Sequence, residues 1–182
     1  MFCIRKATKA DICGLSEVHL QCWQESYPGI IPTDILNNLE LEKYIESWKA
    51  AFENNSQTSV FVAVQGKSIV GLAASGQQRD ENLHVRYPGE FYAVYVLKNS
   101  QRNKVGLHLM DAMCKDLINK QLSAATLWVL EDNLNARKFY EKMGGLKGGI
   151  KEISFHGINK TEIFYFWDDL KTLQSILENT EQ

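Results

Sequence analysis

Residues 90–106 combine a run of aromatic and β-branched residues with a polar, basic turn, and this combination could bind a phosphate. The run from 91 to 97 predicts a buried strand. The turn opens directly into an amphipathic helix, whose apolar residues repeat at helical spacing from Val105 to Ile118. Unpaired N–H groups and the helix dipole at such a helix start favour an anion. The stretch predicts a phosphate cradle or, with equal support, an ordinary strand-to-helix connection.

Residues 133–145 supply a second set of side chains that could do chemistry. Asn133 precedes a predicted helix over about 134–142, and two glycines follow that helix in the position of a C-cap. Tyr140 lies about 100° around the helix from Phe139, so the two rings cannot share one face. This spacing favours a functional role for the Tyr140 phenol over a place in the core beside Phe139.

The elements that position these residues follow from periodicity and turn signals. Strands are expected at residues 2–6, 58–64, 69–74, 91–97, 124–130, 147–155 and 161–167, and helices at about 8–23, 32–52 with a break near 37–38, 105–118 and 134–142. Residues 54–56 are expected to end the second helical region, and residues 75–89 to form a wide loop. With no internal repeat or linker, we expect one α/β domain over residues 1–182, a mixed sheet with helices on both faces. Residues 168–182 form a polar tail that could be helical.

Composition is typical of a globular protein without a strong electrostatic partner. The chain has 182 residues, of which 45% are hydrophobic and 23% charged, and its formal net charge is −2. This balance predicts neither a nucleic-acid partner nor an anionic membrane surface, so any anion site must be local. No apolar run approaches the roughly 20 residues that cross a bilayer, and the first residues lack the apolar core of a signal peptide.

The four cysteines are Cys3, Cys13, Cys22 and Cys114, and none belongs to a Cys-x-x-Cys pair. Most have apolar neighbours, which predicts buried thiols rather than disulfide or zinc partners. Free thiols are typical of a reducing compartment, so we expect a cytoplasmic protein without a metal site.

Two motifs resemble those of the GNAT superfamily of acyl-CoA-dependent N-acyltransferases. The family's phosphate motif, Gln/Arg-x-x-Gly-x-Gly/Ala after a strand, is matched by residues 101–106, which follow Val94-Tyr95-Val96. The second motif, Asn-x-x-Ala-x-x-Phe-Tyr-x-x-x-Gly, is present without a gap over residues 133–144. The N-terminal portion through Pro32 also looks like a bacterial branch, so the resemblance covers nearly the whole chain. It implies the GNAT fold, a mixed sheet of about seven strands, and acetyl-CoA as co-substrate without a metal ion.

The same resemblance implies which residues hold the cofactor. They are Val94, Tyr95, Val96, Gln101, Arg102, Asn103, Lys104, Val105, Gly106, Leu107 and Asn133. Val94 and Val96 would pair with the pantetheine arm like an added strand, and the Val96 N–H would polarise the thioester carbonyl. A solvated Arg102 and an N-cap role for Asn133 are equally consistent. Lys104 stands where the family usually has Gly, which permits close approach and positive φ, and the sequence leaves open whether it weakens coenzyme A binding.

The implied reaction needs a neutral amine, a polarised carbonyl and a proton for the departing thiolate. The resemblance gives the proton donor to Tyr140. Glu90, at the acceptor end of the central strand, is the expected base, acting through water, and a hydrogen-bonded strand-end glutamate is the structural alternative. His84 and Glu162 are further candidates for the base.

The acceptor is expected between the loop after the first helix and the last hairpin. Candidate walls are Trp23, Tyr27, Tyr92 and Tyr165, although aromatic residues at such spacing also fill cores. The predicted enzyme is an N-acetyltransferase in which a primary amine of a small molecule, an antibiotic or a protein attacks acetyl-CoA directly in a ternary complex. The alternatives are a longer acyl-CoA, and a degenerate acyl-CoA-binding sensor or interaction module without turnover. The acceptor and the oligomeric state stay open, a homodimer included.

Overall fold

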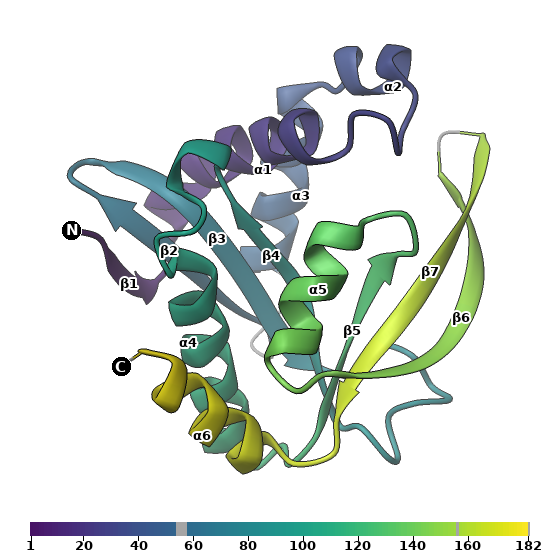
Figure 1. The fold of residues 1–182 in the computed structure, drawn as a ribbon. Helices are drawn as coiled ribbons and strands as arrows, with labels where there is room; N and C mark the ends of the chain where they lie inside the picture. Colours follow the sequence, from purple (N-terminus) through teal and green to yellow (C-terminus); the bar gives the residue numbers. More distant parts are fainter. Residues whose placement is uncertain (54–57, 156, 182) are drawn as a thin grey trace.

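The computed structural model describes residues 1–53, 58–155 and 157–181, and it is built around a seven-stranded mixed sheet (Figure 1). The strand order is β1-β2-β3-β4-β5-β7-β6. The strands are β1 (Cys3–Lys6), β2 (Ser59–Gln65), β3 (Ser68–Gln77), β4 (Gly89–Val96), β5 (Ala125–Leu130), β6 (Leu146–Phe155) and β7 (Ile158–Trp167). Every neighbouring pair is antiparallel except β4 and β5, which are parallel. The expected mixed sheet of about seven strands is confirmed.

Helices cover both faces of the sheet, because alternate side chains of each strand are apolar on both sides. The helices are α1 (Ile12–Ser26), α2 (Thr33–Asn37), α3 (Leu41–Glu53), α4 (Val105–Asn119), α5 (Leu134–Lys142) and α6 (Leu170–Glu181), with short 3-10 turns at Lys9–Asp11 and Lys98–Ser100. On β2, Val60 and Val62 join the core with α1 and α3, whereas Phe61 and Ala63 join the core with α4, α5 and α6. The C-terminal tail forms the helix α6, and its first residue, Leu170, is fully buried.

The parallel pair β4 and β5 separates soon after it forms, as Figure 1 shows. Their pairing comprises only Gly89 with Ala125 and Glu90 with Thr126, while β4 stays paired with β3 along its whole length. The β3–β4 register shifts where Ala74 opposes Ala93 and Ser75 opposes Phe91, so one extra residue, Tyr92, bulges from β4. A bulge bends and twists its strand, and the bend accompanies the divergence of β4 from β5.

Two expectations need correction. The loop expected at residues 75–89 is shorter, because residues 75–77 and 89–90, although polar or small, continue the β3–β4 ladder; tertiary pairing overrides local propensity here. The cysteines are all free, but only Cys22 and Cys114 are buried. Cys3 lies on the edge strand and Cys13 on the outer side of α1, so both are exposed. The expected helix end at residues 54–56 lies outside the described residues.

The helices and the acidic, His and Cys side chains of the described residues bear on membrane and metal binding. Within residues 1–53, 58–155 and 157–181, no helix combines the length and the apolar composition of a bilayer span. The same part of the chain has no cluster of three or more His, Cys, Asp or Glu side chains that could hold a metal ion.

His19 is enclosed by aromatic rings between α1, α3 and β4, and this makes stability depend on pH. Its ring centroid lies 4.5 Å from that of Tyr95, 4.7 Å from that of Tyr44 and 5.7 Å from that of Trp48. Burial lowers the pKa of His19 to about 4. Between this value and the ordinary one of about 6.5, the unfolded chain binds the proton first, so stability falls as pH falls through that window.

We therefore expect the free energy of unfolding to decrease by about 2–3 kcal/mol between pH 7 and pH 4.5. Denaturant titrations at the two pH values measure this change. In His19→Phe the drop should be smaller by that amount, whereas in His84→Phe, at an exposed histidine, it should persist. An identical drop in wild type and His19→Phe would contradict the assignment.

Candidate active site

A cavity of about 1760 Å³ opens where β4 and β5 diverge. Five consecutive residues of β4, 92–96, and four of β5, 127–130, line it. Because successive side chains of a strand point to opposite faces, the cavity reaches both faces of the sheet through the gap between these strands. Two substrates could therefore approach one point from opposite sides.

The edge of β4 that faces the gap is available to an added strand. Beyond Glu90, β4 has no register partner on β5 among the described residues. Val94, Tyr95 and Val96 all line the cavity on this stretch. The carbonyl of Val96 already accepts a hydrogen bond from Gln101 Nε2 at 3.0 Å. An extended ligand can pair with the remaining edge groups as a strand would.

The turn after β4 delivers the start of α4 to the same cavity. Gln101, Arg102, Lys104 and the first three residues of α4, Val105, Gly106 and Leu107, line it, whereas the exposed Asn103 does not. The first N–H groups of α4 have no partners within the helix, and together with the helix dipole they favour a bound anion. Close packing also favours glycine at position 106, since a Cβ there would lie 3.1 Å from Cζ of Phe139 on α5.

Lys104 adopts the left-handed conformation that glycine tolerates best. Its φ is 61° and its ψ 4°, just before α4 begins, and Arg102 has φ 59°. A side chain in this region costs about 1–2 kcal/mol. Glycine, the residue usual in the family at this position, would thus fit the backbone that this chain adopts. Lysine is accommodated there at a conformational cost.

We expect Lys104→Gly to raise the free energy of unfolding by about 1 kcal/mol. Affinity for acetyl-CoA should stay within about tenfold of wild type if, as we expect, backbone N–H groups provide most of the phosphate contacts. Chemical denaturation and calorimetry measure the two quantities. Gln121→Gly is the matched control, since Gln121 has φ 63° at the other end of α4, outside the cavity. A loss of affinity above a hundredfold in Lys104→Gly alone would assign phosphate binding to the lysine side chain instead.

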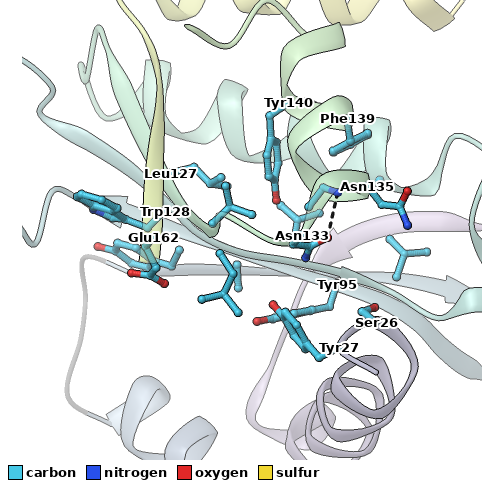
Figure 2. A pocket seen from close by; sticks show the side chains of 18 of the residues that line it. Ser26, Tyr27, Tyr95, Leu127, Trp128, Asn133, Asn135, Phe139, Tyr140 and Glu162 are labelled. Atoms are coloured by element: carbon cyan, nitrogen blue, oxygen red, sulfur yellow. Dashed lines mark hydrogen bonds between the residues drawn. The ribbon is translucent and has the colours of Figure 1, made fainter. Parts of the chain in front are cut away.

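Tyr140 projects from α5 into the cavity, and Figure 2 shows its hydroxyl turned toward the space between the strands. The ring packs against Phe139, Tyr165 and Trp167, with centroid separations of 5.4, 6.2 and 6.4 Å. The helical spacing was expected to keep Tyr140 out of the core beside Phe139, and this expectation is wrong: the two rings pack edge to face in one core. Tyr140 therefore belongs to the core through its ring and to the cavity through its hydroxyl. Burial raises the pKa of Tyr140 well above its usual value, so the phenol keeps its proton at neutral pH.

Asn133 caps α5 and also lines the cavity. Its Oδ1 accepts a hydrogen bond from the N–H of Ala136 at 3.2 Å, the interaction drawn in Figure 2. The structural alternative for this residue is thus confirmed. The cap fixes the first turn of the helix that carries Tyr140.

Glu90 is 2% exposed and bound by a partner that the sequence did not indicate. Arg79 donates to it three times, from the backbone N at 3.0 Å, from Nε at 3.1 Å and from Nη2 at 2.6 Å. The same guanidinium lies 4.1 Å from the ring centroid of Tyr92. All three residues line the cavity. The structure thus contains the structural alternative, a hydrogen-bonded glutamate at the strand end.

The other predicted site residues divide into those inside and those outside the cavity. Trp23 and Tyr27 line it, and Trp23 Nε1 donates to the Tyr95 hydroxyl at 3.1 Å. Tyr165 does not reach it: the residue is 0% exposed, and its hydroxyl donates to Glu141 at 2.6 Å and accepts from Arg137 at 3.2 Å. His84 is exposed and outside the lining. Glu162 lies within the lining, together with Lys151 and Trp128.

The sequence matches the model of a protein family described as the acetyltransferase (GNAT) family over residues 18–145. The chain belongs to this family. A protein of Bacillus subtilis named uncharacterized N-acetyltransferase YuaI is 32% identical over 178 residues, which cover 97% of this chain and 99% of the relative. A probable N-acetyltransferase of Mycobacterium tuberculosis is 27% identical over 142 residues, 76% of each chain.

Solved structures share the fold of this GNAT chain at low sequence identity. An N-acetyltransferase from Staphylococcus aureus superposes with a TM-score of 0.70 at 16% identity, covering 93% of this chain and 99% of the other. The PaiA N-acetyltransferase of Thermoplasma acidophilum, in complex with coenzyme A, gives 0.65 at 19% identity, covering 90% and 98%. Family and fold together confirm an acetyl-CoA-dependent N-acetyltransferase. The alternative, a sensor without turnover, has no support in these relatives.

Proposed function

We propose that this GNAT enzyme transfers the acetyl group of acetyl-CoA to a primary amine by direct attack within a ternary complex. The observation that carries the proposal is the cavity through the gap between β4 and β5, which joins the two faces of the sheet. The open edge of β4 and the start of α4 lie along one part of it, and the aromatic side chains Trp23, Tyr27 and Tyr92 along another. Each substrate then has its own approach to a shared centre.

Coenzyme A would be held mainly by the main chain. The residues proposed to bind it are Val94, Tyr95, Val96, Gln101, Arg102, Asn103, Lys104, Val105, Gly106, Leu107 and Asn133, and all of them except Asn103 line the cavity. The N–H groups at the start of α4 suit the diphosphate, and the edge of β4 suits the pantetheine arm. A Salmonella typhimurium acetyltransferase of the same fold, crystallised with acetyl-CoA, supports this use of the site.

In the proposed chemistry, the amine nitrogen attacks the thioester carbonyl carbon, a C–N bond forms and the C–S bond breaks. Tyr140 provides the proton to the departing sulfur, because its phenol faces the cavity and burial keeps it protonated. Glu90 accepts the proton of the amine through a water molecule. A carboxylate offers about four lone-pair positions, and the three hydrogen bonds from Arg79 leave one on Oε1.

Three broader expectations stay proposals. We infer a cytoplasmic enzyme, because the chain keeps free thiols and acetyl-CoA is an intracellular metabolite. We also infer one domain spanning residues 1–182. A homodimer stays a prediction without support in the contacts of this single chain.

Calorimetry with acetyl-CoA followed by a thiol-release assay over a panel of primary amines tests the function. We expect binding of acetyl-CoA and release of CoA thiol that depends on both substrates. Binding without release from any amine of the panel would overturn the proposed transfer, and absence of binding would overturn the cofactor site.

A further inference from the structure

A lysine of the chain itself occupies a site built for an alkylammonium group. Lys151 Nζ lies 3.8 Å from the ring centroid of Trp128 and 3.3 Å from Oε2 of Glu162. These residues come from three adjacent strands, β6, β5 and β7, and all three line the cavity. A carboxylate beside an aromatic face is the combination that recognises an organic cation.

This site lies on the face of the sheet opposite to α5, the helix that carries Tyr140. On β7, Ile163 and Tyr165 are buried in the core with α5 and α6. Glu162 therefore projects from the opposite face, because neighbouring strand residues alternate. That face is the acceptor side of the proposed reaction, where Tyr27 also lies. Tyr27 and Glu162 both line the cavity.

Lys151 can leave this site at little cost. Its side chain is 41% exposed and that of Glu162 is 21% exposed, and an ion pair so placed contributes little to stability. Three other cavity carboxylates have partners in the protein: Arg79 binds Glu90, the N–H of Lys98 donates to Glu25, and the Tyr165 hydroxyl donates to Glu141. An incoming ammonium could replace the lysine and keep both contacts, with the lysine turning into solvent.

The charge held there is not the reacting nitrogen. Figure 2 shows Glu162 and Trp128 beside one another, well apart from the hydroxyl of Tyr140. The nitrogen that attacks the thioester must be neutral and must lie near Tyr140. An acceptor that uses both places needs an amine at one end and a positive charge at the other.

We propose that Glu162 and Trp128 form a subsite for the distal ammonium group of the acceptor, in exchange for Lys151, and that the acceptor is a linear alkyl diamine. The inference rests on the proposed function, since the near amine of the diamine is the one acetylated. That amine loses its proton and gains the acetyl group, and the distal ammonium stays charged throughout.

Three ligands with the same five-carbon chain test the subsite: 1,5-diaminopentane, pentylamine and 5-aminopentanoate, whose distal groups are cationic, apolar and anionic. We expect kcat/KM for thiol release to favour the diamine over pentylamine by about tenfold or more, with the anionic compound used least. In Glu162→Gln the ratio of diamine to pentylamine should fall toward one. Equal use of all three ligands by the wild type would overturn the inference and leave the proposed function standing.

Lys151→Met should raise kcat/KM for the diamine severalfold, because the internal competitor is gone while the aliphatic stem stays. The matched control is Lys147→Met, at an exposed lysine of β6 outside the cavity, which should behave as wild type. A diamine preference that decreases in Lys151→Met would overturn the exchange. A higher kcat/KM for a peptide with lysine beside its N-terminal amine than for 1,5-diaminopentane would also overturn the inference. The acceptor would then be a protein.

Calorimetry on the CoA-loaded protein separates this inference from the function itself. Tighter binding of 1,5-diaminopentane than of pentylamine to the CoA-loaded protein, with no thiol release from acetyl-CoA in the parallel kinetic assay, would support the cation subsite and overturn the transfer reaction. Equal binding of the two amines, with thiol release intact, would overturn the subsite alone.

Discussion

Replacing Tyr140 with phenylalanine is expected to lower kcat by about 10² to 10⁴, with little change in the affinity for acetyl-CoA. The substitution removes one hydroxyl group and keeps the ring, which packs against Tyr165 and Trp167. The fold and the cofactor groove should therefore survive. What is lost is the hydroxyl that faces the cavity, the proposed proton donor to the departing sulfur. Steady-state kinetics with a saturating amine and calorimetry with acetyl-CoA measure the two effects.

Tyr165→Phe is the matched control, because it removes a tyrosine hydroxyl from the same region but outside the cavity. That hydroxyl bonds to Arg137 and Glu141, and its loss should cost about 1 kcal/mol of stability with kcat within a few-fold of wild type. A Tyr140→Phe variant as active as Tyr165→Phe would contradict the role of Tyr140. The proton would then come from water or from another residue of the cavity.

The parts of the site that the sequence predicted are those that local spacing determines. The start of α4 follows its strand after a short turn, and Asn133 and Tyr140 lie on one short helix, so their relative places depend on few backbone angles. The left-handed conformation of Lys104 was not evident, because a lysine gives no sign of positive φ. The family pattern carried that information, since glycine is the residue such a backbone favours.

The parts that the sequence did not predict depend on strand register and phase. On β7 both alternating sets are apolar, Ile163 and Tyr165 on one face and Phe164 and Phe166 on the other, so the pattern could not say which face is the core. Tyr165 was consequently expected at the acceptor site. Arg79, in a loop, and Lys151, on a strand far from Trp128 in sequence, reach the cavity only through tertiary pairing.

Glu90→Gln is expected to lower kcat/KM by about 10² or more, because an amide cannot accept the proton of the attacking amine. The glutamine keeps the shape of the side chain and an oxygen that can accept from Arg79. Glu90 is 2% exposed while the Arg79 side chain is 63% exposed, so the guanidinium can be hydrated when its partner loses charge. The stability cost should thus stay near 1–2 kcal/mol, and kinetics well below the unfolding midpoint measure the chemical effect.

Arg79→Met distinguishes a base from a structural anchor by removing the partner and keeping the carboxylate. A buried charge then lacks its guanidinium, and we expect the free energy of unfolding to drop by about 3 kcal/mol. The double variant Arg79→Met/Glu90→Gln should recover part of that loss, since no charge stays buried, but it should stay as inactive as Glu90→Gln. If Glu90 only anchors Arg79, Glu90→Gln will instead lose stability and keep its kcat/KM, and the base must be sought at Glu162 across the cavity. Glu162 is also the proposed ligand of the distal ammonium, so its role as a base would then have to be measured apart from its role in binding. The reaction with pentylamine does this, because pentylamine carries no distal charge.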